Sequence, residues 1–264
     1  MVSAVRRKTL RGLKQSKHSG DMKMKGVIKG MVLTSIAIAV QQVTMLVFAF
    51  RGIIGDPNTK SWTFDQGSVV INDEAPVSLV EYMGGQGLLL GSLVGIIILL
   101  IGGYFLFGNS LSGLAIRPFT VKSAAKWALV FVAFVGLSSW MESWTDSVQE
   151  DQMSKLFQNG SKTFGIVGVF FAAAILIPLF EELAFRGFLY TELDSAFGPQ
   201  AAVAVSSVLF AIAHMQYDIT LVGLVLVAGL ILGMLRRSTN SILPGLLLHS
   251  LNNAAALVMA LHNQ

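Results

Sequence analysis

The sequence predicts an all-α protein, a polytopic transmembrane helical bundle. Hydrophobic residues make up 53% of the 264 residues, the mean hydropathy is +0.66, and 13% of the residues are charged. Soluble domains, by contrast, carry about 25% charged residues. The apolar residues also gather in runs that approach the roughly 20 residues a helix needs to cross a bilayer. We therefore expect one membrane-embedded bundle and no separate soluble domain.

Seven apolar runs are candidate transmembrane helices. The fifth run is short, which makes it a candidate for a partly re-entrant helix, and pairs of runs leave room for an eighth half-helix. The expectation is thus about seven spans, with eight as the alternative. The runs lie at roughly 28–50, 84–107, 123–141, 164–188, 200–216, 219–235 and 241–261.

The distribution of Lys and Arg predicts the orientation of the bundle. Residues 1–29 hold nine of the 19 basic residues. Beside a long apolar run this predicts a cytoplasmic flank more than a nucleic-acid site. The acid-rich loops at 51–83 and 142–163 are expected outside, and the loops at 108–122 and 236–240, which have Arg or Lys and no acid, inside. The N-terminus is then cytoplasmic and the C-terminus outside.

The long loop at 51–83 contains Gly, Pro and Asn turn signals and an alternating stretch at Ser68–Asn72. This pattern predicts a small hairpin. The sequence contains no cysteine, which excludes disulfide bonds, thiolate catalysis and cysteine-ligated metal.

Three charged residues lie well inside a predicted span, within IPLFEELAFRGFLY at 177–190. Each costs about 2.5–3.5 kcal/mol at a helix centre, so such residues usually face a polar cavity or a partner. Glu182 and Arg186 are i,i+4 and can pair on one helix face, whereas Glu181 is rotated by about 100° and keeps its carboxylate for other work. Pro178 is expected to distort the helix just before them. The structural alternative is an ion pair whose charges reach the lipid headgroups.

Two histidines lie in the spans that follow the glutamates. Phe210 and His214 are i,i+4, and so are His249 and Asn253, which places each pair on one helix face. Taken singly, each histidine is typical of a packed helix residue, and Asn253 is typical of a hydrogen bond between membrane helices. In combination with Glu181 they favour a catalytic site.

The chemistry that suits this set is the activation of water. Glu181 can take a proton from water, and His214 can orient that water or act as a second base. His249 and Asn253 can donate to the oxygen that becomes negative in a tetrahedral intermediate. Two histidines and a glutamate also form a plausible zinc set, in which Glu181, His214 and His249 would be the ligands. The usual HExxH pair is absent, so no cofactor is favoured and zinc remains the alternative.

Together these stretches resemble the CPBP family of intramembrane proteases, also called the CAAX-protease or Abi family, which includes the type II CAAX prenyl endopeptidases. The resemblance covers residues 164–262, and residues 1–163 carry no matching motif. The family motifs EExxxR, FxxxH and HxxxN appear in this order as Glu181, Glu182 and Arg186, as Phe210 and His214, and as His249 and Asn253.

The resemblance implies an intramembrane endopeptidase. The family is often labelled metalloprotease, but we favour a glutamate mechanism, which needs no metal. It implies a membrane-anchored or lipidated peptide or protein as substrate, of which a prenylated CAAX peptide is the best-known case. The lipid bilayer is the other expected partner, and nucleic acid is not expected. The implied catalytic residues are Glu181, His214, His249 and Asn253, and the implied supporting residues are Glu182, Arg186 and Phe210.

The predicted organisation has three parts. Residues 1–27 form a basic cytoplasmic tail, residues 28–163 an N-terminal region of three spans with acidic outer loops, and residues 164–262 a CPBP-like catalytic core. Two other classes remain open. One is a non-enzymatic membrane scaffold or bacteriocin-immunity-type protein that retains the fold. The other is an ion-coupled transporter, because intramembrane Glu and His also suit proton relays, although no repeat halves support it.

Overall fold

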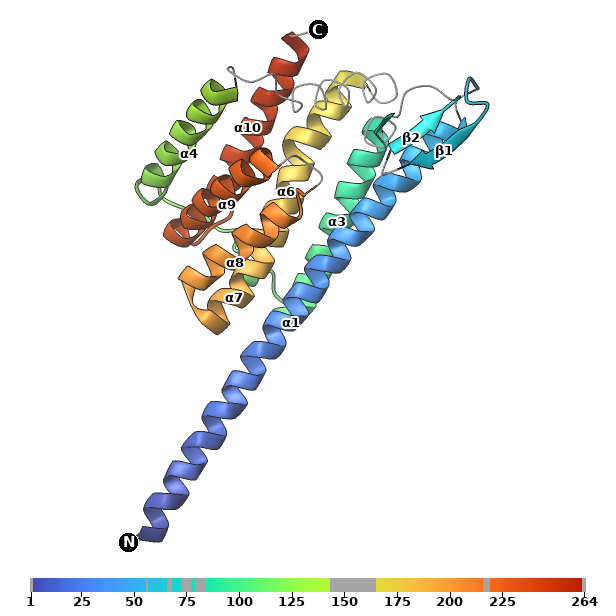
Figure 1. Cartoon of the computed structure of the whole chain (residues 1–264). Coiled ribbons are helices and arrows are strands. Elements are labelled where there is room, and N and C mark those ends of the chain that lie inside the picture. The colour runs from blue at the N-terminus through green and yellow to red at the C-terminus, as the bar shows by residue number, and fades with distance from the viewer. Residues whose placement is uncertain are drawn as a thin grey trace.

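The structure is a computed structural model built almost entirely of helices (Figure 1), as the sequence predicts. It describes residues 2–55, 57–65, 68–72, 77–78, 84–142, 165–215 and 219–262. Most of the acidic loop predicted at 142–163 lies outside the described residues.

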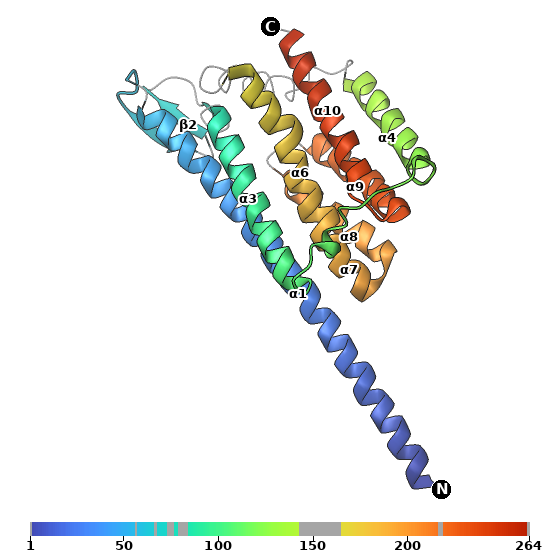
Figure 2. The same ribbon diagram turned by 180° about the vertical axis from the view of Figure 1, so that it is seen from behind.

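Two long helices, α1 (Val2–Gly55) and α3 (Gly84–Leu106), run alongside each other on one side of the molecule. The N-terminal part of α1 projects beyond the bundle in both Figure 1 and Figure 2. The basic residues predicted as a tail therefore continue the first apolar run as a single helix, with no break at residue 27.

A small antiparallel sheet lies between these two helices in the chain. Its strands are β1 (Trp62–Asp65), β2 (Ser68–Ile71) and β3 (Val77–Ser78), in the order β1-β2-β3. The hairpin expected from the alternating residues is confirmed by the antiparallel pairing of β1 and β2. The alternating residues form β2, the central strand of the sheet. Val69, on β2, is fully buried and packs with Ile53 of α1, so the sheet is fixed to the end of that helix.

Three helices form the opposite side of the bundle, namely α4 (Val121–Glu142), α9 (Ile219–Thr239) and α10 (Leu243–His262). A single 3₁₀ turn, η1 (Ser112–Leu114), lies in the connection that leads to α4. The contact between α4 and α9 is apolar, with Phe131 of α4 packed in one cluster with Ile231 and Leu235 of α9.

The helix that carries the two glutamates lies at the centre, between α3 and α10 (Figures 1 and 2). Half of its most apolar window is buried inside the protein, against 11–39% for the other span candidates. It runs from Gly165 to Phe197 and is followed by α8 (Pro199–Ile212). Within it, helical residues 165–171 are followed by η2 (Ala172–Leu176), α6 (Ile177–Glu181), η3 (Glu182–Leu189) and α7 (Tyr190–Phe197).

Five helices of the described residues are long and apolar enough to cross a membrane: Gly20–Gly55, Gln86–Leu106, Val121–Trp140, Gly165–Phe197 and Ile219–Thr239. Two more apolar helices, Pro199–Ile212 and Leu243–Met259, are shorter. They correspond to the fifth and seventh predicted spans, so the count of seven or eight spans remains a prediction. The prediction of a loop at 236–240 is wrong for most of that range, because α9 continues to Thr239.

Candidate active site

Two π-helical segments lie on either side of α6 in the central helix. The first, η2, ends where Ile177 donates its N–H to the carbonyl of Ala172, five residues back. The second, η3, begins at Glu182. Pro178 supplies a cause for the first segment, since a residue without an N–H cannot continue the regular bonding pattern. The distortion predicted from Pro178 thus appears as a π segment and not as a break in the helix.

Glu182 and Arg186 form the predicted i,i+4 ion pair, with Arg186 Nη1 3.2 Å from Glu182 Oε1. Their side chains are 1% and 0% exposed, so the alternative in which they reach lipid headgroups is wrong. A buried ion pair is stable only with further partners. Arg186 has two: its guanidinium lies 4.1 Å from the centre of the Phe210 ring, and its Nη2 donates to the carbonyl of Gly229 at 3.4 Å.

His249 of α10 lies between the two glutamates. Its Nδ1 is 3.4 Å from Glu182 Oε1, and its Nε2 is 3.5 Å from Glu181 Oε2. Gly245, one turn earlier, allows this approach, because a Cβ at that position would lie 3.0 Å from Glu182 Oε2. These polar distances are slightly longer than a typical hydrogen bond, as is common in catalytic sites before the substrate binds.

His214 lies two residues beyond the end of α8, in a turn closed by its own N–H on the carbonyl of Ala211 at 2.9 Å. Its Nδ1 lies 2.8 Å from the carbonyl of Phe210. A carbonyl oxygen only accepts, so Nδ1 carries a proton in this arrangement. The other ring nitrogen, Nε2, lies 3.7 Å from Glu181 Oε1.

The structure therefore brings Glu181, His214 and His249 together, as predicted. Each oxygen of the Glu181 carboxylate faces the Nε2 of one histidine. The side chains of Glu181, His214 and His249 are 16%, 17% and 11% exposed, whereas that of Glu182 is 1% exposed. Glu181 is thus the glutamate that solvent can reach, and Glu182 is enclosed.

Phe210 forms an aromatic wall behind this cluster. Its ring centre lies 4.6 Å from that of His214 and 6.1 Å from that of His249. It also packs edge-to-face on Phe185 of the central helix at 5.2 Å. The phenylalanine predicted as a supporting residue contacts both histidines and Arg186.

Asn253 makes a hydrogen bond between membrane helices, the contact that is typical of asparagine there, while donation to the negative oxygen stays a prediction. Its amide nitrogen donates to the backbone carbonyl of Ala173 at 3.1 Å, which joins α10 to η2. The bond lies one turn along α10 from His249, on the same face of the helix.

Arg236 was missed by the sequence reasoning, which placed it in an inner loop. The side chain is buried and donates from Nε to the carbonyl of Arg186 at 3.0 Å and from Nη1 to Asn240 Oδ1 at 2.9 Å. Its guanidinium also lies over the ring of Tyr190. Arg236 follows Gly229 by seven residues, so both lie on the helix face that meets Arg186, but no spacing in the sequence relates this face to Arg186.

The donor types at the site suit zinc, with the Nε2 atoms of His214 and His249 3.7 Å and 3.5 Å from the two oxygens of Glu181. Within the described part of the chain, no group of three or more His, Cys, Asp or Glu side chains is arranged to hold a metal ion.

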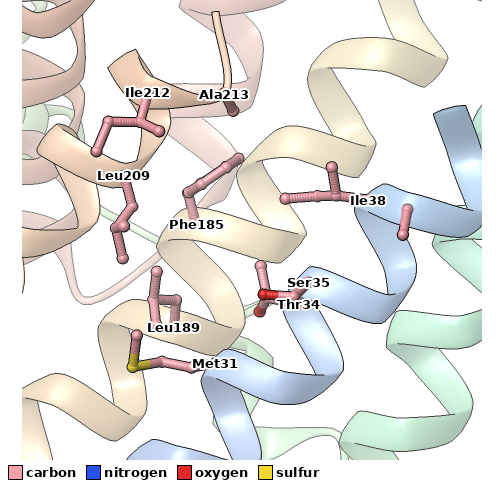
Figure 3. A pocket seen from close by; sticks show the side chains of 10 residues that line it. Met31, Thr34, Ser35, Ile38, Phe185, Leu189, Leu209, Ile212 and Ala213 are labelled. Atoms are coloured by element: carbon pink, nitrogen blue, oxygen red, sulfur yellow. The ribbon is translucent and has the colours of Figure 1, made fainter.

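An apolar pocket of about 310 Å³ lies beside the site, between α1 and the end of α8 (Figure 3). Two of its lining residues adjoin the cluster of Glu181, His214 and His249. Phe185 packs on Phe210, and Ala213 directly precedes His214. The residues that line it are Met31, Thr34, Ser35, Ile38, Ala39, Phe185, Leu189, Leu209, Ile212 and Ala213.

Comparison with known families gives a match in the C-terminal part of the chain. Residues 163–255 match the family model described as type II CAAX prenyl endopeptidase Rce1-like. This part of the chain is Rce1-like. The match confirms the resemblance to the CPBP family, and the matched segment contains all three motifs. Neither the curated proteins nor the solved structures that were compared gave a match.

The Rce1-like match and the apolar helices together support an integral membrane protein of the intramembrane protease class. A family of this kind implies a membrane-associated protein as the substrate.

Proposed function

We propose that the protein is an intramembrane endopeptidase that hydrolyses a peptide bond of a membrane-presented substrate without a metal. The observation that carries the proposal is the placement of one carboxylate, Glu181, with a histidine Nε2 atom facing each of its oxygens.

Glu181 is the general base in this proposal. It takes a proton from a water molecule, and the resulting hydroxide attacks the carbonyl carbon of the scissile peptide bond. His214 is suited to orient the water, because a proton on Nδ1 leaves a lone pair on Nε2 that faces Glu181. Glu181 then returns the proton to the leaving amine, so the products are a carboxylic acid and an amine.

His249 is the donor to the negative oxygen of the tetrahedral intermediate. In its doubly protonated form the ring donates from Nδ1 to Glu182 and turns its Nε2–H toward the reaction centre. Asn253 has two amide N–H groups, and the one that does not bond Ala173 is assigned to the same oxygen. Glu182, Arg186 and Phe210 hold His249 and His214 in place.

The substrate in this proposal is a peptide or protein anchored in the membrane by an apolar group. The pocket between α1 and α8 supports this choice, because it is lined mainly by apolar side chains and ends one residue before His214. We assign the anchor of a lipidated, CAAX-like substrate to this pocket. We place the N-terminus in the cytoplasm and the C-terminus outside, on the bias of the basic residues.

The test compares purified wild type with Glu181→Gln and His249→Ala in detergent, on quenched peptides with and without a lipid anchor. Glu192→Gln is the matched control, since Glu192 lies on the same helix in α7 and outside the cluster. Cleavage by wild type and by the control, but by neither site variant, supports the proposal. Cleavage that survives Glu181→Gln overturns the assigned base.

The same assay with a chelator separates the two ways of activating water. Activity that persists after chelation and dialysis supports the glutamate mechanism. Activity that is lost and then restored by added zinc identifies Glu181, His214 and His249 as metal ligands instead. If wild type cleaves no peptide, and Glu181→Gln still replaces the wild type in cells that lack the protein, the scaffold alternative is favoured.

A further inference from the structure

The hydrogen bond from Asn253 to Ala173 connects residues 80 positions apart, at 3.1 Å. Its acceptor is a backbone carbonyl in the middle of a helix. Such carbonyls ordinarily accept from an N–H of their own helix, and Ala173 is buried, with 5% of its surface exposed. A hydrogen bond to this carbonyl from a side chain of another helix therefore requires an explanation.

Pro178 provides that cause. The carbonyl of Ala173 would accept from the N–H of Ile177 in an α-helix and from that of residue 178 in a π-helix. Ile177 donates to Ala172 instead, and Pro178 has no N–H. Neither helix pattern supplies a donor to Ala173, and a buried carbonyl without a partner costs as much as a lost hydrogen bond. Asn253 supplies the missing donor.

The position of this bond relates it to the candidate active site. Pro178 precedes Glu181 by three residues, so the unbonded carbonyl belongs to the turns that lead into the catalytic glutamate. Asn253 follows His249 by one helical turn. The bond thus joins the helix turn that carries Glu181 to the helix that carries His249, whose Nε2 lies 3.5 Å from Glu181 Oε2.

We propose that Asn253 is a positioning residue, which replaces the donor lost at Pro178 and so fixes Glu181 against His249. The catalytic part of this inference rests on the proposed endopeptidase function. It is distinct from donation to the negative oxygen of the intermediate, because it acts through Ala173. Pro178 allows the two roles to be separated.

The test is a double-mutant cycle between Asn253→Ala and Pro178→Ala. Alanine at 178 restores an N–H that reaches the carbonyl of Ala173 in the π geometry. Asn252→Ala is the matched control, a neighbouring, half-buried asparagine on α10. Thermal unfolding and the separate values of kcat and KM are measured in detergent for every variant.

In the wild-type background, Asn253→Ala is expected to lower Tm by about 2–4 °C. It is also expected to lower kcat by about 10–100-fold with little change in KM, since small displacements of catalytic groups have effects of this size. In the Pro178→Ala background, the loss of Tm should be less than half of its value in the wild-type background. The logarithm of the fold-loss of kcat should also be less than half. Asn252→Ala should give the same small change in both backgrounds.

Equal losses of Tm and kcat in the two backgrounds would overturn the inference, and would leave Asn253 with a role at the reacting oxygen alone. If the effect of Asn253→Ala on Tm depends on residue 178 but its effect on kcat does not, the bond is only structural, which contradicts a positioning role. If wild type has no peptidase activity, the proposed function fails, while the Tm cycle still decides whether Asn253 replaces the donor at Pro178. If Asn253→Ala does not fold, Asn253→Asp removes the donor with little change of size and takes its place in the cycle.

Discussion

His249 Nδ1 lies 3.4 Å from Glu182 Oε1, the same oxygen that pairs with Arg186 at 3.2 Å. One buried carboxylate oxygen thus orients the imidazole of α10 and neutralises the arginine of the central helix. The position of His249 depends on an ion pair that solvent does not reach. The two adjacent glutamates therefore differ in their surroundings: Glu182 is enclosed by Arg186 and His249, whereas Glu181, which solvent reaches, is the one proposed to take part in the reaction.

Loss of the Glu182 carboxylate should destabilise the protein far more than loss of the Glu181 carboxylate. Glu182→Ala leaves the Arg186 charge buried without its partner, which costs about 3–5 kcal/mol. Glu181→Ala should cost much less, because that side chain is 16% exposed. Thermal unfolding in detergent measures both, and similar losses in the two variants would contradict the division of roles.

The double variant Glu182→Leu with Arg186→Met should separate stability from activity. Replacement of a whole buried ion pair by apolar side chains is often neutral or stabilising, so Tm should recover toward the wild-type value. Peptidase activity should stay absent, because His249 has lost the carboxylate at its Nδ1. Recovery of activity along with Tm would show that the pair does not orient the imidazole.

Arg236→Met should destabilise the protein by about 1.5–3 kcal/mol, the range for hydrogen bonds made by charged groups. The change removes the donor to the carbonyl of Arg186 and the bond to Asn240. Arg237→Met is the matched control, since Arg237 is the next residue and is exposed. Unfolding in detergent measures both variants, and equal effects would show that burial of Arg236 contributes nothing.

Gly245→Ala should lower the activity, while Gly223→Ala should not. Both changes raise helix propensity by about 1 kcal/mol. At Gly245, however, the new methyl group lies 3.0 Å from Glu182 Oε2, whereas nothing lies within 4 Å at Gly223. Overpacking of this kind typically costs about 1–3 kcal/mol, here at the carboxylate that orients His249. A kcat for Gly245→Ala equal to that for Gly223→Ala would show that Glu182 has room to move.

Ala39→Phe should raise KM for a lipidated peptide and leave KM for a peptide without a lipid unchanged. The new ring would fill part of the pocket of about 310 Å³ that Ala39 lines (Figure 3). Val43→Phe is the control, because Val43 lies one turn further along α1 and its side chain is exposed. Peptidase assays with paired substrates measure the effect. An equal change in KM for both peptides would place the apolar anchor elsewhere.

Local spacing predicted the parts of the site that depend on one helix. The pair of Glu182 and Arg186 followed from an i,i+4 relation, and the freedom of Glu181 from its rotation away from that pair. The convergence of His214 and His249 on Glu181 was expected from their chemistry and from the resemblance, because no spacing rule relates residues on three helices.

Tertiary contacts decided what the sequence could not predict. Arg236 is at the end of an apolar run, where a surface position is the usual outcome, and its burial follows from contacts with the carbonyl of Arg186 and the ring of Tyr190 on the central helix. Asn253 was expected to make either a hydrogen bond between membrane helices or a contact with the reacting oxygen. Its bond to Ala173 depends on which carbonyl Pro178 leaves without a donor, and that in turn depends on a π segment whose length the sequence does not specify.

The shortness of α8 bears on where in the membrane a peptide bond can be cut. Fourteen residues of helix rise about 21 Å, less than the roughly 30 Å of a bilayer's hydrocarbon core. If α8 begins at one face of the bilayer, it ends before the other face, and His214 lies two residues beyond that end. In the proposed function, hydrolysis would then take place below the surface, and water would have to be admitted to that depth. A substrate tethered by a buried tail already holds its neighbouring peptide bonds at such a level, whereas a soluble peptide would have to leave water to reach it.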